Sequence, residues 1–297
     1  MRAFRLLTVL ILAVVLLRSA ANAADPGWPK ELTFALLSTE SSQEISRRWQ
    51  PILAQLEKDL GVKVKSTVAT DYRGTIEALK FKKAELGWLG PKAYVEATRN
   101  NYANVDAIAQ VRNENGSLGY RACLIAHAES DVFSPEDIAG RTFAFNDPNS
   151  TSGYLVPMTF FMNEMGIDPK KHFSKITFSG SHEASIFAVA NRKVEVASTN
   201  IPDMQQITRE GKVPRGAVRV IWVSKLIPLD PVVVRKDLPP SLRAAITESL
   251  VTMKERNAEA FAHAGAYFKG GFVPATDAKY EVIREMNEAS RRLATQK

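Results

Sequence analysis

Three consecutive hydroxyl residues, Ser150, Thr151 and Ser152, form the group in this sequence that is best suited to bind a ligand. They lie within residues 146–157, which read Asn-Asp-Pro-Asn-Ser-Thr-Ser-Gly-Tyr-Leu-Val-Pro. An apolar run precedes them and an amphipathic segment follows, which predicts a strand that breaks into the start of a helix. Such a start gathers backbone N–H groups at the positive end of the helix dipole and suits a small tetrahedral oxyanion. Serine and threonine are also favoured there as N-caps for stability alone, so this stretch by itself leaves both roles open.

Three further polar residues are expected in loops that follow predicted strands. Tyr72 follows one strand, His182 follows a Gly-Ser pair, and Asp230 lies between two prolines. Each also has an ordinary structural role, as a packing residue, a helix cap or a residue that orders a turn. Together with the hydroxyl run, Tyr72 and His182 would surround an oxyanion with neutral donors, which bind it without burying a fixed positive charge.

Alternating strands and helices predict the framework that positions these residues. Strands are predicted at residues 31–38, 62–68, 84–89, 107–112, 120–126, 142–145, 176–178, 194–198, 218–224 and 232–235. Helices are predicted at residues 45–60, 75–81, 92–100, 155–165, 184–191, 240–260 and 277–295. This pattern predicts an α/β protein with largely parallel sheets in two units, joined by strands that suit hinge closure. Ligands bind at the carboxyl ends of the strands in such sheets, which places Ser38, Tyr72 and Leu89-Gly90 on one rim.

The amino terminus reads as a secretory signal peptide. Arg2 and Arg5 precede an apolar run over residues 6–17, and Ala21-Asn22-Ala23 supplies a cleavage pattern of small residues. Cleavage is expected after Ala23, and the exported protein is expected in the periplasm. No later run is long enough to span a membrane, so the mature protein is not expected to be membrane-embedded.

The remaining composition argues against several classes of function. Residues 1–23 contain three arginines and no acid, so the rest of the chain has 36 basic and 32 acidic residues, a mild net charge of +4. No run of lysine and arginine supports a nucleic-acid partner. No HExxH, CxxC, Gly-rich phosphate loop or GxSxG motif is present, so we expect no metal, no cofactor and no enzyme activity. The single cysteine, Cys123, is expected to be a buried free thiol.

Five segments of the chain resemble the phosphonate-binding periplasmic proteins of ABC importers (PhnD type). They are residues 147–157, 71–72, 180–183, 188–191 and 226–231, and the resemblance stays collinear from about residue 31 to 237. It implies a type II periplasmic binding protein fold whose two α/β lobes close over a ligand. Lobe 1 would comprise residues 24–120 and 226–297, lobe 2 residues 121–225, and residues 1–23 would be the signal peptide.

The resemblance also implies a set of ligand-binding residues. The phosphonate oxygens would be held by Tyr72, Ser150, Thr151, Ser152 and His182, and Asp230 would face the substituent on phosphorus. Ser38, Leu89 and Asp203 are further candidates.

Two positions depart from the pattern of the aminoethylphosphonate-type members. Leu89 stands where those members have a second tyrosine, and Pro202, with Asp203 beside it, stands where they have a glutamate. We therefore expect a phosphonate-like head group with a smaller or differently charged tail, such as an alkylphosphonate, phosphite or a phosphate ester.

The expected partners are this ligand and the membrane permease of an ABC importer. A sulfonate or sulfate receptor is the nearest alternative, because sulfonates are isosteric with phosphonates. A protein that presents its ligand to a sensor is another, whereas a periplasmic phosphatase is disfavoured.

Overall fold

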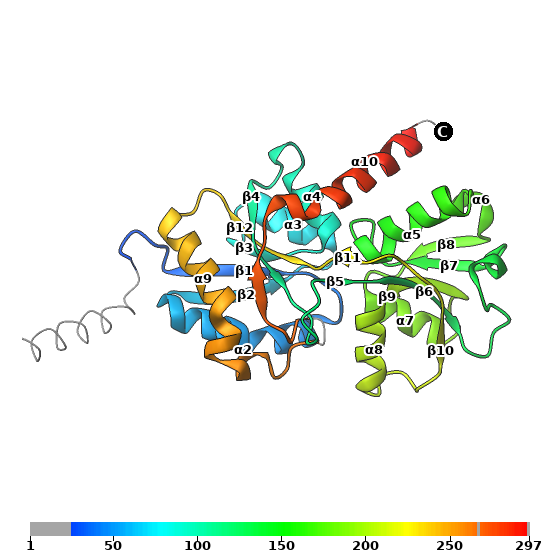
Figure 1. The fold of residues 1–297 in the computed structure, drawn as a ribbon, viewed down its shortest axis with the longest axis horizontal. Coiled ribbons are helices and arrows are strands. Elements are labelled where there is room, and N and C mark those ends of the chain that lie inside the picture. The colour runs from blue at the N-terminus through cyan, green and yellow to red at the C-terminus, as the bar shows by residue number, and fades with distance from the viewer. Residues whose placement is uncertain (1–24, 266–267, 296–297) are drawn as a thin grey trace, which may run out of the picture.

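The computed structural model describes residues 25–265 and 268–295, so the predicted signal peptide and its cleavage site lie outside the described residues. It has two main sheets that lie side by side, with a short two-stranded ladder between them (Figure 1). Within the described ranges, no helix combines the length and the apolar character needed to cross a lipid bilayer.

The larger sheet has six strands in the order β13-β4-β12-β3-β1-β2. Its strands are β1 (Glu31–Leu36), β2 (Lys63–Val68), β3 (Leu86–Trp88), β4 (Val105–Val111), β12 (Pro231–Arg235) and β13 (Phe272–Pro274). The smaller sheet has five strands in the order β10-β6-β9-β7-β8. Its strands are β6 (Ala122–His127), β7 (Thr142–Phe145), β8 (Lys175–Phe178), β9 (Val196–Asn200) and β10 (Val218–Val223).

The chain passes between the two sheets at β5 (Gly119–Tyr120) and β11 (Ile227–Pro228), which pair antiparallel with Tyr120 opposite Ile227. From this ladder β5 leads into β6 of the five-stranded sheet, and β11 leads into β12 of the six-stranded sheet. The structure thus has the strand-like crossings that the sequence predicts.

The α/β class is confirmed, but the prediction of largely parallel sheets is wrong in part. β1 pairs parallel with β2 and β3, and β7 pairs parallel with β8 and β9. β12 and β13 make antiparallel pairs in the six-stranded sheet, and β6 and β10 make antiparallel pairs in the five-stranded sheet. The double crossing accounts for the pairs made by β12 and β6, because each of these strands arrives from the other sheet and enters between two neighbours of the opposite direction. β13 pairs antiparallel with β4 at the edge of its sheet.

Helices cover both sheets. The six-stranded sheet is accompanied by α2 (Ser42–Leu60), α3 (Tyr72–Lys80), α4 (Pro91–Thr98), α9 (Pro240–Arg256) and α10 (Glu281–Thr295). The five-stranded sheet is accompanied by α6 (Pro169–His172), α7 (His182–Ala190), α8 (Ile201–Arg209) and a helical run formed by η3 (Thr151–Leu155), α5 (Val156–Thr159) and η4 (Phe160–Glu164). Short 3-10 turns are η1 (Arg99–Asn101), η2 (Pro135–Ile138), η5 (Ala258–Phe261) and η6 (Asp277–Tyr280).

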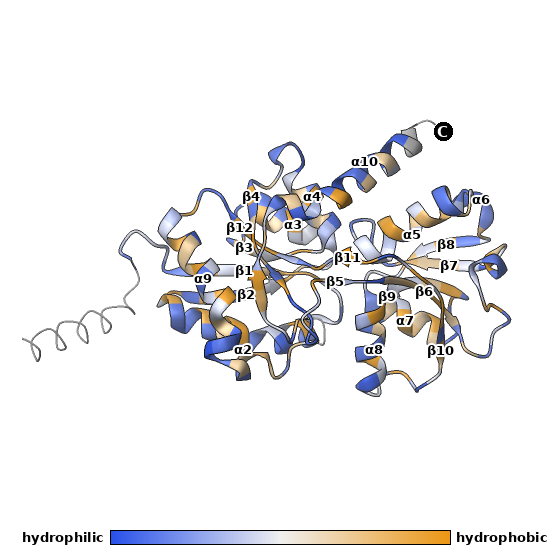
Figure 2. Ribbon diagram, in the orientation of Figure 1, coloured by the Kyte–Doolittle hydropathy of each residue, from blue (hydrophilic) through white to orange (hydrophobic). Residues whose placement is uncertain are grey.

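Each sheet has its own aromatic core. In the first, Trp49 of α2 packs against Trp88 at 5.3 Å and against Phe268 at 5.5 Å between ring centroids. In the second, Phe143 stacks on Phe173 at 4.6 Å. Hydrophobic colour gathers on the strands, while α8 shows both hydrophilic and hydrophobic residues (Figure 2). The apolar residues of α2 recur at helical spacing, so the helix turns one face to the sheet. The close packing of both cores holds the strand ends in place around the site.

Three segments predicted as loops instead begin helices. Tyr72 and His182 are the first residues of α3 and α7. α8 begins at Ile201, between the strands predicted at residues 194–198 and 218–224, where no helix was predicted. In each case the preceding residue caps the helix, as when the Asn200 side chain accepts a hydrogen bond from the Asp203 N–H at 2.9 Å. The caps shorten the loops, so the candidate residues sit on helix starts rather than on flexible segments.

Candidate functional site

A small cavity lies where the elements of the two sheets meet. It is lined by Leu37, Thr39, Tyr72, Gly90, Tyr120, Ser150, Thr151, Ser152, His182, Asn200 and Asp230. All six residues predicted to bind the ligand are therefore brought together. Among these lining residues there is no lysine or arginine, and Asp230 is the single carboxylate.

The hydroxyl run begins the helix that follows β7, as the sequence predicts. The Ser150 side chain accepts a hydrogen bond from the Gly153 N–H at 3.0 Å and is the N-cap. The Thr151 hydroxyl accepts one from the Lys92 N–H of α4 at 2.8 Å. The N-cap role is therefore observed. It is compatible with the anion-binding role, because an oxygen that accepts from the backbone still has its hydrogen to donate.

Gly153 allows the helix start to lie against the end of β7. A Cβ atom at this position would lie 2.3 Å from the Asn146 Cβ and 2.9 Å from the Ser150 Oγ. No other residue fits this close approach without a backbone shift, which explains a glycine directly after three hydroxyl residues.

His182 connects the hydroxyl run to the neighbouring strand. Its Nδ1 lies 3.1 Å from the Thr199 Oγ1, and its Nε2 lies 3.4 Å from the Ser152 Oγ. Burial lowers the pKa of His182 to about 3, so the ring is neutral at physiological pH. A neutral ring donates from one nitrogen and accepts at the other, which suits a position among hydroxyl groups.

Two tyrosines face the hydroxyl run from other elements. Tyr72 comes from α3, and its backbone N–H donates to the Asp147 Oδ2 at 3.4 Å. Tyr120 comes from the crossing strand β5, and its phenol group hydrogen-bonds to the side chains of Ser152 and Thr151. Burial, with nearby carboxylates, raises the pKa of both phenols well above the ordinary value, so both are protonated donors.

Asp230 supplies the negative end of the cavity. It lies between β11 and β12 with only 3% of its surface exposed, and its carbonyl accepts from the Val111 N–H at 3.1 Å. Its charge is one of the causes that raise the pKa of Tyr72, Tyr120 and Tyr280.

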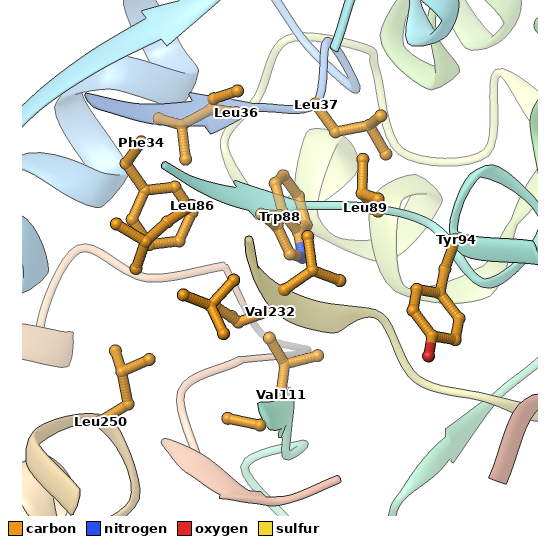
Figure 3. Close-up of a cluster of buried hydrophobic side chains, with 14 of the residues drawn as sticks. Phe34, Leu36, Leu37, Leu86, Trp88, Leu89, Tyr94, Val111, Val232 and Leu250 are labelled. Carbon is orange, nitrogen blue, oxygen red and sulfur yellow. The ribbon is translucent and has the colours of Figure 1, made fainter. Parts of the chain in front are cut away.

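The three further candidates do not line the cavity. Leu89 is fully buried beside Leu37 and Trp88 in the apolar core (Figure 3). Ser38 is buried, with no hydrogen-bond partner for its hydroxyl among the described residues. Asp203 turns instead to Asn200, whose Nδ2 donates to it at 2.7 Å, and burial followed by the charge of Glu40 raises the pKa of Asp203 to about 7.

Five lining residues were not predicted to bind the ligand, although Gly90 was expected on the rim. They are Leu37, Thr39, Gly90, Tyr120 and Asn200. Tyr120 was assigned to an apolar strand, and its place at the crossing between the sheets becomes evident only in the structure. Thr39 lies in the short polar run after β1, next to Ser38.

Comparisons with known proteins identify the family. The family model described as "ABC transporter, phosphonate, periplasmic substrate-binding protein" matches residues 34–280. The phosphonates-binding periplasmic protein of Escherichia coli (strain K12) is 36% identical over 234 residues, which cover 77% of this chain and 68% of that protein. The phosphate-import protein PhnD of Mycolicibacterium smegmatis is 29% identical over 302 residues, which cover 92% of each.

A solved structure agrees with these relatives. The binding protein component of an ABC phosphonate transporter from Pseudomonas aeruginosa is 32% identical, with a TM-score of 0.81 over 88% of this chain and 87% of that one. The expected type II periplasmic binding protein fold and the resemblance seen in the sequence are both confirmed. This chain belongs to the family of periplasmic substrate-binding proteins of phosphonate ABC transporters.

Proposed function

We propose that this protein binds a small phosphorus oxyanion with a compact, amine-free substituent in the cavity between the two sheets. The observation that carries the proposal is the lining itself, in which hydroxyl, phenol and imidazole groups surround the space and Asp230 is the one charged group. Neutral donors stabilise a bound anion, and no fixed positive charge has to be buried when the cavity is empty.

In this proposal the head group is held mainly by the start of the helical run. Ser150, Thr151 and Ser152 donate to the phosphonate oxygens, and His182 and Tyr72 complete the set. Hydrogen bonds to a charged group contribute roughly 1.5–3 kcal/mol each. Five of them are enough for affinity at micromolar levels or tighter after the cost of ordering the two lobes.

Asp230 distinguishes phosphonates from sulfonates in this proposal. A monoprotonated phosphonate has an acidic proton that the buried carboxylate can accept, whereas a sulfonate has only oxygen lone pairs to place against it. The repulsion disfavours the sulfonate. Binding should also weaken as pH rises and the phosphonate loses this proton.

Neither of the two positions that depart from the aminoethylphosphonate pattern lines the cavity. Leu89 is part of the apolar core, and Pro202 lines a separate surface groove together with Ile201 and Gln205. No second carboxylate is therefore available among the lining residues to pair with an ammonium group.

The test is a calorimetric panel on the purified protein. The panel contains methylphosphonate, phosphite, phosphate, methyl phosphate, 2-aminoethylphosphonate and methanesulfonate. Phosphate belongs in it because one relative is named for phosphate import and another for phosphonates. We expect an amine-free phosphorus ligand to bind tightest. Tighter binding of 2-aminoethylphosphonate than of every amine-free compound, or of methanesulfonate than of methylphosphonate, would contradict the proposal.

The cellular setting is also part of the proposal. The signal peptide is cleaved after Ala23, and the mature protein delivers its ligand to the membrane permease of an importer without catalysing a reaction. Lobe 1 (residues 24–120 and 226–297) and lobe 2 (residues 121–225) close by bending at β5 and β11. The intact mass of the protein recovered from a periplasmic extract checks the cleavage site, since a chain that still contains Met1 would show that export does not process it.

A further inference from the structure

A polar network joins the elements of the two sheets beside the ligand cavity. Its members from the six-stranded side are Glu40, Glu44 and Arg48, at and near the start of α2. Its members from the five-stranded side are Glu183, Gln206, Glu210 and Lys212, on and after α7 and α8. Two residues of the cavity lining, Thr39 and His182, are the immediate chain neighbours of network members.

Glu183 makes the most direct connection between the two sides. Its backbone N–H donates to the Thr39 carbonyl at 3.3 Å, and its Oε2 accepts from the Ser41 N–H at 3.1 Å. Its Oε1 accepts from the Lys212 Nζ at 2.8 Å. Glu183 is buried, so this one residue fastens the start of α7, which carries His182, to the loop after β1, which carries Thr39.

The other members add ion pairs that cross in the same direction. Arg48 is paired through two nitrogens with Glu40 on its own side, at 2.9 and 3.0 Å, and reaches Glu210 on the other side at 2.7 Å. Lys212 lies 3.6 Å from a Glu40 oxygen, and the Gln206 Nε2 donates to Glu40 at 3.3 Å.

The network is arranged so that opening the lobes leaves no charge unpaired. Arg48 would keep Glu40, and Lys212 would keep Glu183, while the contacts that cross between the sides would be lost. Because each cation keeps a partner on its own side, the crossing contacts can favour closure without locking it. The carboxylates of Glu40, Glu44 and Glu210 also lie close enough to one another for a metal ion, but Arg48 and Lys212 already pair with them.

We propose that Glu183 is a positioning residue that links capture of the ligand at His182 to closure of the two lobes. It does not touch the ligand. It instead makes the closed arrangement of the cavity walls more favourable, so that a ligand bound between them dissociates more slowly. This inference rests on the proposed function only in assuming that the ligand binds between the two sheets.

The test compares Glu183→Ala with the matched variant Glu195→Ala. Glu195 has the same chemistry within the five-stranded side alone: one oxygen accepts from the Thr142 N–H at 2.8 Å and the other pairs with Arg141 at 3.0 Å. Affinity for methylphosphonate and phosphite is measured by calorimetry, and the dissociation rate by stopped flow. We expect Glu183→Ala to weaken binding by about 10- to 100-fold, mainly through faster dissociation, while Glu195→Ala binds like the wild type.

Two further measurements keep the test decisive. Glu183→Gln retains an oxygen for the Ser41 N–H and loses the charge, so it should bind with intermediate affinity and guards against misfolding of the alanine variant. Small-angle scattering without ligand should show a larger radius of gyration for Glu183→Ala than for the wild type. Unchanged affinity and unchanged scattering in both Glu183 variants, or equal weakening in Glu195→Ala, would overturn the inference. A wild type that binds no probe would contradict the proposed function, and the scattering comparison would still decide the role of Glu183.

Discussion

The hydroxyl oxygens of Ser150 and Thr151 accept backbone hydrogen bonds that hold the fold, and in the proposed function their hydrogens are donated to the ligand. Ser150 caps its own helix, and Thr151 accepts from α4 of the other side. Tyr72 differs, because its contact with Asp147 uses the backbone N–H and leaves the phenol to the cavity. Residues that look equivalent as ligand donors should therefore respond differently to mutation.

Tyr72→Phe should weaken ligand binding by roughly 1–3 kcal/mol and leave the stability of the ligand-free protein nearly unchanged. Ser150→Ala should weaken binding similarly and also lower the free energy of unfolding by about 1 kcal/mol, because a cap is lost. Calorimetry and urea unfolding of the two variants measure the two effects. Equal stability of the variants would show that the Ser150 cap contributes nothing, and wild-type binding by both would place the ligand elsewhere.

His182 predicts a dependence of stability on pH. Its pKa is lowered to about 3 in the folded protein, whereas an unfolded histidine has a pKa of about 6.5. The unfolded state therefore binds more protons between these values, so this contribution to stability is complete above pH 6.5 and is lost as pH falls. The loss should reach about 2 kcal/mol at pH 5. Urea unfolding at pH 5 and pH 7 should show this difference in the free energy of unfolding in the wild type and a smaller one in His182→Gln. An equal difference in the two proteins would contradict the prediction.

At the scale of elements, the helical run after β7 depends on one close approach. Gly153→Ala would place its Cβ against Asn146 and Ser150, and both neighbours are buried. Because neither can move away without shifting β7 or the helix start, we expect destabilisation of about 2–3 kcal/mol together with a large loss of affinity. Thermal unfolding and calorimetry test this. Gly180→Ala, at a glycine with a φ of 87° and open space around it, is the control for backbone strain without a clash.

Local sequence patterns predict most of these elements but misplace their starts. The strand at β7 and the helix after it follow from the apolar run and the amphipathic spacing, and Ser150 follows from cap preference. α8 was missed because Asn200, Pro202 and Asp203 are residues typical of a turn as well as of a first helical turn. The Asp203 N–H donates a hydrogen bond to the Asn200 side chain, which favours the helical turn over a loop, and a local sequence pattern does not reveal this bond.

At the scale of the whole molecule, the sequence predicts two α/β units and strands that cross between them, and the structure has both. The antiparallel strands could not be predicted, because the insertion of β12 between β3 and β4 depends on pairing across more than a hundred residues. Tyr120 was missed for the same reason. Its partner strand β11 is distant in sequence, so nothing local marks it as part of the cavity.

Thr151 has a consequence for how the protein chooses among anions. Its oxygen is held by the Lys92 N–H, which belongs to the opposite side, so the complete set of donors exists only when the two sides meet. In the proposed closure, an anion arrives before the two sides meet, so the full set of donors contacts it only afterwards. Preferred and rejected anions should therefore enter at similar rates and differ in their residence times, so the protein discriminates by how long it retains an anion rather than by which anion it admits.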